Sequence, residues 1–66
     1  MEISLNGERR DVPDGLTAEA LLASLDLASR RVALEINLEI VPRGLFPETL
    51  LRAGDRVEIV QAIGGG

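Results

Sequence analysis

The first fifteen residues constrain the fold most, because they predict a β-hairpin. Met1–Leu5 alternates apolar and polar residues, the period of two that is typical of a half-buried strand. Asn6-Gly7 follows, a strong signal for a type I′ turn, which needs positive φ at both central positions. Glu8–Val12 is then predicted to return as a second strand, and Pro13-Asp14-Gly15 ends it with turn residues. The chain therefore begins with the edge of a sheet.

One short helix is predicted next. Thr17 is placed as its N-cap, and Glu19 lies where the positive end of the helix dipole favours an acidic residue. Apolar residues at i, i+3, i+4 and i+7 form one face of this helix: Ala18, Leu21, Leu22 and Leu25. The segment 26–31 is expected to be a connector.

Three further strands are predicted after the connector. Residues 32–36 alternate as a strand, Asn37-Leu38 is a tight turn, and residues 39–41 form a short strand that Pro42 stops. Residues 44–51 are interpreted as an irregular or 3₁₀ segment that covers the core. Ala53-Gly54-Asp55 is another turn, and residues 57–62 form the last strand, with Val57 and Ile59 facing inward.

This order of elements predicts a two-layer α+β domain: a mixed sheet of four to five strands with one helix packed on one face. A single helix covers only one face of a sheet, so the other face is expected to be open to solvent. Counting alternate positions assigns six residues to the open face: Glu8, Arg10, Ala33, Glu35, Glu58 and Val60. Most are polar, whereas Ala33 and Val60 mark a small apolar contact patch.

The composition excludes several classes of function. The 66 residues contain no Cys or His, all seven basic residues are Arg, and eleven acidic residues leave a net charge of −4. The chain therefore lacks a thiol nucleophile, a Schiff-base lysine and the usual general base near neutral pH. An acidic domain whose one aromatic residue is Phe46 is a poor candidate for nucleic-acid binding. No long apolar run predicts a membrane span, and residence in the cytoplasm is expected.

The sequence ends in Gly64, Gly65 and Gly66, directly after an apolar strand. Glycine has no Cβ, so such an arm can enter a narrow channel. Three extended residues would carry the terminal carboxylate roughly 10 Å beyond Ile63. The other interpretation is that such an end is a linker or a remnant of processing, since termini are commonly disordered.

Four blocks of residues form a recognisable pattern: Ile3-x-Leu5-Asn6-Gly7, Asn37-x-x-Ile40-Val41-Pro42-Arg43, Ala53-Gly54-Asp55-Arg56-Val57-Glu58-Ile59-Val60 and Ile63-Gly64-Gly65-Gly66. Together they resemble the ThiS family, the sulfur carriers of thiamin biosynthesis, which have the ubiquitin-like β-grasp fold. The blocks extend across almost the whole chain. The resemblance implies a β-grasp domain at residues 1–63 and a flexible glycine tail at residues 64–66.

The resemblance also implies a mechanism in which the chain is a co-substrate rather than an enzyme. A ThiF-type adenylating enzyme would use ATP and magnesium to convert the Gly66 carboxylate into an acyl-adenylate. A persulfide donor would then leave a thiocarboxylate, whose sulfur passes to thiazole synthase. Gly64 and Gly65 would form the arm, and partners would grip Val60, Gln61, Ala62 and Ile63. No bound cofactor or metal and a monomeric free state are expected.

Other functions fit the same pattern. A small MoaD-like subunit of molybdopterin synthase or a carrier for tRNA thiolation would share the fold, the tail and the adenylation step. A non-catalytic β-grasp interaction module, or a modifier that forms isopeptide bonds through its terminus, belongs to a different class. Arg43 is expected to make a structural or solvated contact in any of these proteins.

Overall fold

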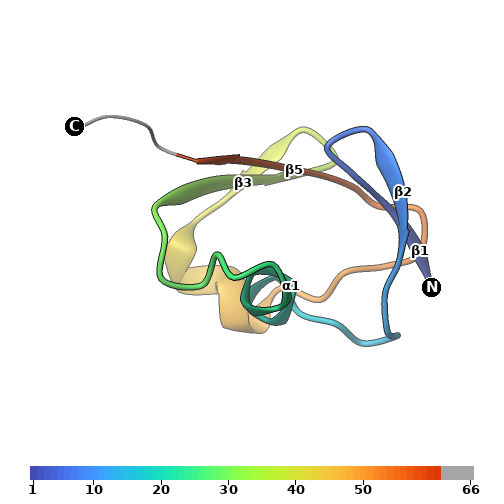
Figure 1. Cartoon of the computed structure of the whole chain (residues 1–66), viewed down its shortest axis with the longest axis horizontal. Helices are drawn as coiled ribbons and strands as arrows, with labels where there is room; N and C mark the ends of the chain where they lie inside the picture. Colours follow the sequence, from blue (N-terminus) through green and yellow to red (C-terminus); the bar gives the residue numbers. More distant parts are fainter. Residues whose placement is uncertain (62–66) are drawn as a thin grey trace.

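The computed structural model describes residues 1–61 as five strands, one α-helix and one 3₁₀ helix (Figure 1). In chain order they are β1 (Glu2–Leu5), β2 (Glu8–Asp11), α1 (Ala18–Ser24), β3 (Val32–Ile36), β4 (Glu39–Val41), η1 (Arg43–Glu48) and β5 (Arg56–Gln61). The predicted elements are all present: β3 and β4 have the predicted bounds, and the other described ends shift by at most three residues. The predicted end of the last strand at residue 62 lies outside the described residues. The helix ends at Ser24, so Leu25 is its C-cap and not part of its last turn.

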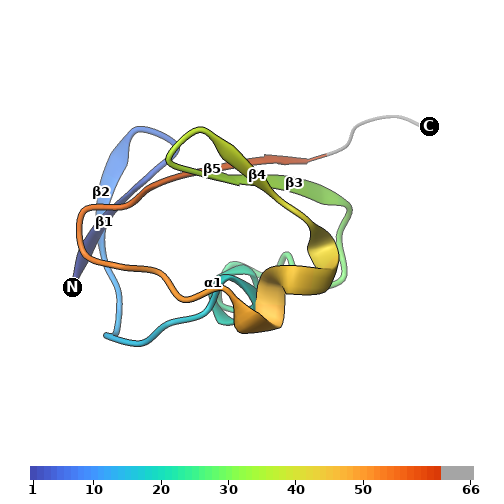
Figure 2. The same ribbon diagram turned by 180° about the vertical axis from the view of Figure 1, so that it is seen from behind.

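The five strands form one mixed sheet in the order β2-β1-β5-β3-β4. The central strand β5 runs parallel to β1 and antiparallel to β3, and the two hairpins β1-β2 and β3-β4 lie on either side of it. Figures 1 and 2 show α1 and η1 together on one side of the sheet, while no element of residues 1–61 lies on the opposite side. The predicted α+β architecture with a helix on one face is confirmed.

Both hairpins use two-residue turns with positive φ. Asn6 has φ 49° and Gly7 has φ 85°, as the type I′ interpretation requires. The second turn places Asn37 at φ 52° and Leu38 at φ 71°. Leucine is a poor residue for the left-handed region because its Cβ crowds the backbone there. Leu38 is also 73% exposed, so packing does not offset this cost.

The core lies between the sheet and the two helices. Its buried apolar residues come from every layer: Ile3, Leu5, Val12, Ala18, Leu21, Leu22, Leu34, Phe46, Leu51, Val57 and Ile59. The predicted inward positions Val57 and Ile59 are confirmed, and Phe46 of η1 is a buried member of the core. No buried side-chain polar atom within the described part of the chain lacks a hydrogen-bond partner.

The assignment of Glu8 and Arg10 to the open face is wrong. Leu5 pairs with Glu8 and Ile3 pairs with Arg10 across the first hairpin. Residues directly opposite in an antiparallel pair share one face, so Glu8 and Arg10 lie on the same face as the core residues. Both side chains stay exposed because β2 is an edge strand that the helix does not reach. Counting alternate positions failed here because a two-residue turn makes its flanking residues direct neighbours.

Candidate functional site

The strand β5 leads to the glycine end and is the centre of the candidate site. It lies in the middle of the sheet, held by β1 on one side and by β3 on the other. Its last described residue is Gln61, which pairs with Val32 of β3. The predicted site residues Ala62, Ile63, Gly64, Gly65 and Gly66 lie outside the described residues.

Asn6 connects the first hairpin turn to β5. Its side-chain oxygen accepts a hydrogen bond from the Ile59 backbone N–H at 2.8 Å, and its side-chain amide donates to the Ile59 carbonyl at 3.2 Å. The Asn6 backbone N–H also donates to the Val57 carbonyl at 2.8 Å. β1 turns away at Asn6, and the Asn6 side chain then forms the backbone hydrogen bonds that a further strand residue would form. These bonds extend the pairing along β5 from Val57 to Ile59.

Asn37 makes a similar connection from the second hairpin turn. Its side-chain oxygen accepts from the Arg56 backbone N–H at 3.0 Å, and its own backbone N–H donates to the Arg56 carbonyl at 2.8 Å. Its side-chain amide donates to Asp55 at 3.0 Å, and Asp55 also accepts from the Arg52 backbone N–H at 2.8 Å. The start of β5 is therefore fixed by a network of polar side chains.

The outer face of β5 confirms the remaining open-face assignments. Ala33 pairs with Val60, and Glu35 pairs with Glu58, on the face opposite to the core. Val60 is 63% exposed although it is a large apolar residue, and Ala33 beside it is exposed. Glu35 and Glu58 are like charges placed directly opposite each other, an arrangement that destabilises a sheet. The predicted partner-binding residues Val60 and Gln61 are both exposed.

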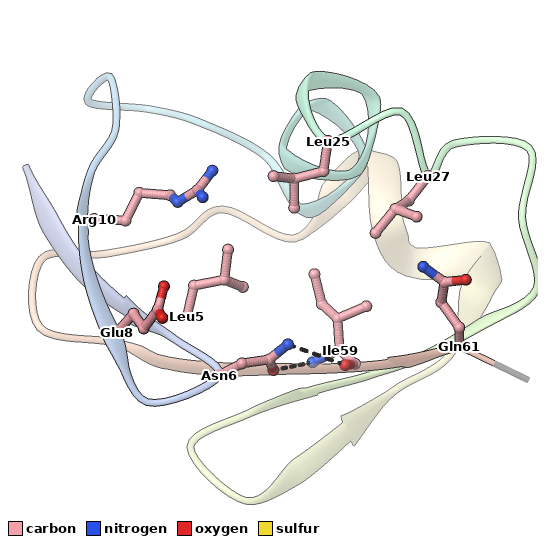
Figure 3. Close-up of a pocket in the computed structure, with 8 residues that line it drawn as sticks. All are labelled: Leu5, Asn6, Glu8, Arg10, Leu25, Leu27, Ile59 and Gln61. Carbon is pink, nitrogen blue, oxygen red and sulfur yellow. Dashed lines mark hydrogen bonds between the residues drawn. The ribbon is translucent and has the colours of Figure 1, made fainter.

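The inner side of the same region contains an open groove of about 460 Å³ (Figure 3). Four apolar residues from the sheet and from the end of the helix line it, together with four polar ones: Leu5, Leu25, Leu27, Ile59, Asn6, Glu8, Arg10 and Gln61. Figure 3 shows Arg10 and Gln61 at opposite ends of the groove, with the Asn6–Ile59 hydrogen bonds along its lower edge. The groove therefore lies beside the end of β5.

Two other kinds of functional feature are a metal centre and a membrane-spanning helix. Residues 1–61 contain no group of three or more His, Cys, Asp or Glu side chains that could hold a metal ion. Within the same residues, no helix is long and apolar enough to cross a membrane. Arg43 donates to the Arg30 carbonyl at 2.7 Å, which confirms the structural contact predicted for it. What the arrangement provides is a firmly held central strand with an exposed end.

Comparison with known proteins agrees with the resemblance. Residues 3–66 match the sequence model of the ThiS family. The chain belongs to the ThiS family. It is 35% identical to the sulfur carrier protein ThiS of Escherichia coli K12, and the match covers all of both chains. A crystal structure of a ThiS thiamine biosynthesis protein from Geobacter metallireducens superposes with a TM-score of 0.86 at 33% identity, over all of both chains. The fold of this ThiS family member is accordingly the ubiquitin-like β-grasp fold.

Two relatives with higher sequence identity are much longer than this chain. A thiazole synthase from Paramagnetospirillum magneticum is 47% identical and one from Magnetococcus marinus is 42% identical, each over all 66 residues. The chain spans 20% of the length of each of these relatives. In both proteins a ThiS-like region therefore belongs to the same polypeptide as the rest of a thiazole synthase.

The sequence-based reasoning missed the roles of Asn6 and Asn37. Both were assigned only to turns, whereas both also bind the backbone of β5 through their side chains. A weak signal was present, because each asparagine stands first in its turn at the end of a strand. Asparagine tolerates the left-handed region and forms hydrogen bonds with nearby backbone, so it is the residue expected to combine the two roles.

Proposed function

We propose that this chain is a sulfur carrier for thiazole formation in thiamin biosynthesis, with the carboxylate of Gly66 as its reacting group. The observation that carries the proposal is the match over both whole chains to a protein named as the sulfur carrier ThiS. The lack of Cys, His and Lys supports it, because no thiol, imidazole or lysine amine of the same protein then competes for an activated main-chain terminus. The chain is thus a co-substrate and not a catalyst.

The chemistry must begin with activation, since a carboxylate at neutral pH is a poor electrophile. A ThiF-type adenylating enzyme would transfer AMP from ATP to the Gly66 carboxylate, with magnesium on the phosphates and release of pyrophosphate. The terminal sulfur of a persulfide would then attack the acyl carbon and displace AMP. Attack by a second thiol on the S–S bond would release the donor as a disulfide and leave a thiocarboxylate. Every activating group belongs to a partner, and this chain contributes its terminus.

The arm and its support have distinct roles in this proposal. Gly64 and Gly65 would lie in the channel of the partner, where a Cβ would obstruct passage. Val60, Gln61, Ala62 and Ile63 would contact the partner at the mouth of that channel. Asn6 would keep the end of β5 in one position, so the arm leaves the domain in a defined direction. A fixed starting point reduces the conformational entropy that is lost when the arm enters the channel.

Thiazole synthase is the proposed recipient of the sulfur. Two relatives carry a ThiS-like region within the polypeptide of a thiazole synthase. This arrangement supports a physical contact between the carrier and the synthase. The carrier is proposed to act in the cytoplasm as a free monomer. No observation on the described residues favours the molybdopterin or tRNA pathway over this assignment.

The test is the intact mass of the carrier after incubation with the adenylating enzyme, ATP, magnesium and a persulfide donor. Exchange of one terminal oxygen for sulfur is expected in the wild-type chain. A variant that lacks Gly66 is the matched control, and it should remain unchanged in mass. An unchanged mass in the wild-type chain, or sulfur incorporation in both chains, would contradict the proposal.

A further inference from the structure

At Gln61, β5 pairs with β3 on one side, whereas no strand of residues 1–61 pairs with it on the other side. The backbones of Val57 and Ile59 face β1, since the Val57 carbonyl and both backbone groups of Ile59 form hydrogen bonds with Asn6. Alternate residues of a strand direct their backbone groups to the same side. The N–H and C=O of Gln61 therefore also face the β1 side.

No strand of residues 1–61 occupies that side at Gln61. The register of β1 with β5 comprises Ser4–Arg56 and Leu5–Val57, after which the chain turns away through Asn6-Gly7. On its other side β5 stays paired with β3 up to Gln61–Val32. Within the described residues, the sheet thus has an unpaired backbone edge beside Gln61 of its central strand, in addition to the edges at its outer strands. Such an edge presents a free donor and acceptor that another extended backbone can satisfy.

The groove of about 460 Å³ lies on the inner side of this same edge. Leu5 and Ile59, which line it, are each 9% exposed, whereas Ile3 and Val57 on the same strands are 1% and 0% exposed. The core is therefore less completely covered where it meets the groove. Leu25 and Leu27 add apolar surface from the end of the helix, and Glu8 and Arg10 supply a polar rim (Figure 3).

We infer that an extended segment of thiazole synthase adds a strand beside Gln61, in line with β1, and places an apolar side chain in this groove. The two features complement each other, because strand addition takes affinity from the main chain and specificity from a pocket for alternate side chains. The inference rests on the proposed function, since it assigns the surface through which the carrier meets the recipient of its sulfur.

The domain arrangement of two relatives favours this partner. A strand paired at the end of β5 makes few hydrogen bonds, so its intrinsic affinity is low. Linking two modules in one chain raises their effective concentration and lets a weak contact persist. The relatives from Paramagnetospirillum and Magnetococcus have this linkage, because the whole of this chain matches 20% of a thiazole synthase. The same contact would guide the residues after Gln61 toward the synthase.

The experiment compares Gln61→Pro with Gln61→Ala in binding to purified thiazole synthase by calorimetry. Proline lacks the N–H that faces the open edge, while alanine keeps it and loses only the side chain. The Gln61 N–H faces away from β3, so the β3–β5 pairing is retained in both variants, and thermal unfolding checks this. Gln61→Pro is expected to bind about tenfold more weakly than Gln61→Ala. Equal affinity of the two variants would overturn the inference.

Hydrogen exchange of the wild-type carrier provides a second test that needs no substitution. The Gln61 amide should exchange quickly in the free carrier and become protected when thiazole synthase is added. The Val60 amide faces β3, so it should already be protected in the free carrier. An unchanged Gln61 rate in the complex would refute strand addition. Protection that depends on carrier concentration without synthase would identify a second copy as the occupant and refute the assigned partner.

These outcomes are separate from the test of the proposed function. Sulfur loading is measured by mass with the adenylating enzyme and needs no thiazole synthase. If the carrier loads sulfur but both Gln61 variants bind the synthase equally, the inference alone fails. If the wild-type carrier does not load sulfur, the proposed function fails whatever the binding data show.

Discussion

The side chain of Asn6 is expected to be one of the largest single contributors to stability among the polar residues. It makes two hydrogen bonds to the backbone of Ile59, at 2.8 and 3.2 Å, across 53 positions of the sequence. A hydrogen bond contributes about 0.5–1.5 kcal/mol, so the loss of two should cost about 1–3 kcal/mol. Asn6→Gly removes both hydrogen bonds without straining the turn, because glycine keeps the positive φ of 49° at no steric cost, although it also gives the unfolded chain more freedom.

Asn6→Ala should be worse than Asn6→Gly. Alanine also removes both hydrogen bonds, and its Cβ adds about 1–2 kcal/mol in the left-handed region. In a domain of this size, 1 kcal/mol shifts Tm by roughly 4–8 °C. The Tm of Asn6→Gly should therefore fall by at least about 4 °C, and the Tm of Asn6→Ala should fall further.

Urea and thermal unfolding measure these differences, and Leu38→Ala is a matched control in the other hairpin turn. It also sits at positive φ, but its side chain is 73% exposed and, being aliphatic, forms no hydrogen bond. It should change stability by less than Asn6→Gly does. If Asn6→Gly were as stable as the wild-type chain, the side-chain connection to β5 would contribute nothing, and the reasoning would be refuted.

Three other predictions follow from the turns, the tail and the net charge. Leu38→Gly should stabilise the fold by about 1 kcal/mol, because it relieves the positive φ of 71°; a lower urea midpoint would contradict this. Gly65→Ala should slow the release of pyrophosphate by the adenylating enzyme, because a Cβ obstructs a narrow channel; an unchanged rate would count against that channel. With a net charge of −4, the carrier should bind its partners more weakly as salt rises, and calorimetry at two ionic strengths checks this.

The order of elements was predictable because its signals are local. The hairpin at Asn6-Gly7, the capped helix after Thr17 and the strand end at Pro42 each depend on a few adjacent residues. The inward positions Val57 and Ile59 followed from the period of two within one strand. The faces of Glu8 and Arg10 did not, because alternation cannot be counted through a turn without knowing which residues it sets opposite each other.

The candidate site was predictable only in part. The residue types already showed that no side chain of this protein can act as a thiol nucleophile, a Schiff-base lysine or a histidine base, and they directed attention to the terminal glycines. Nothing in the order of residues placed Asn6 against Ile59, because that contact joins the two ends of the chain. The assignment of the reacting group to Gly66 and the domain boundary after residue 63 remain predictions, since they fall on residues 62–66.

The sequence by itself determined the succession of strands and helix, the positions of the two hairpin turns, the acidic charge and the absence of Cys, His and Lys side chains. These depend on residue identity and on neighbours within one turn or one strand. The tertiary structure alone decided which strand lies in the centre, how Asn6 and Asn37 hold it, and that no strand of residues 1–61 lies beside Gln61 on its β1 side. The physical reason is that strand pairing joins residues distant in the chain, so an edge exists only once every other strand has taken its place.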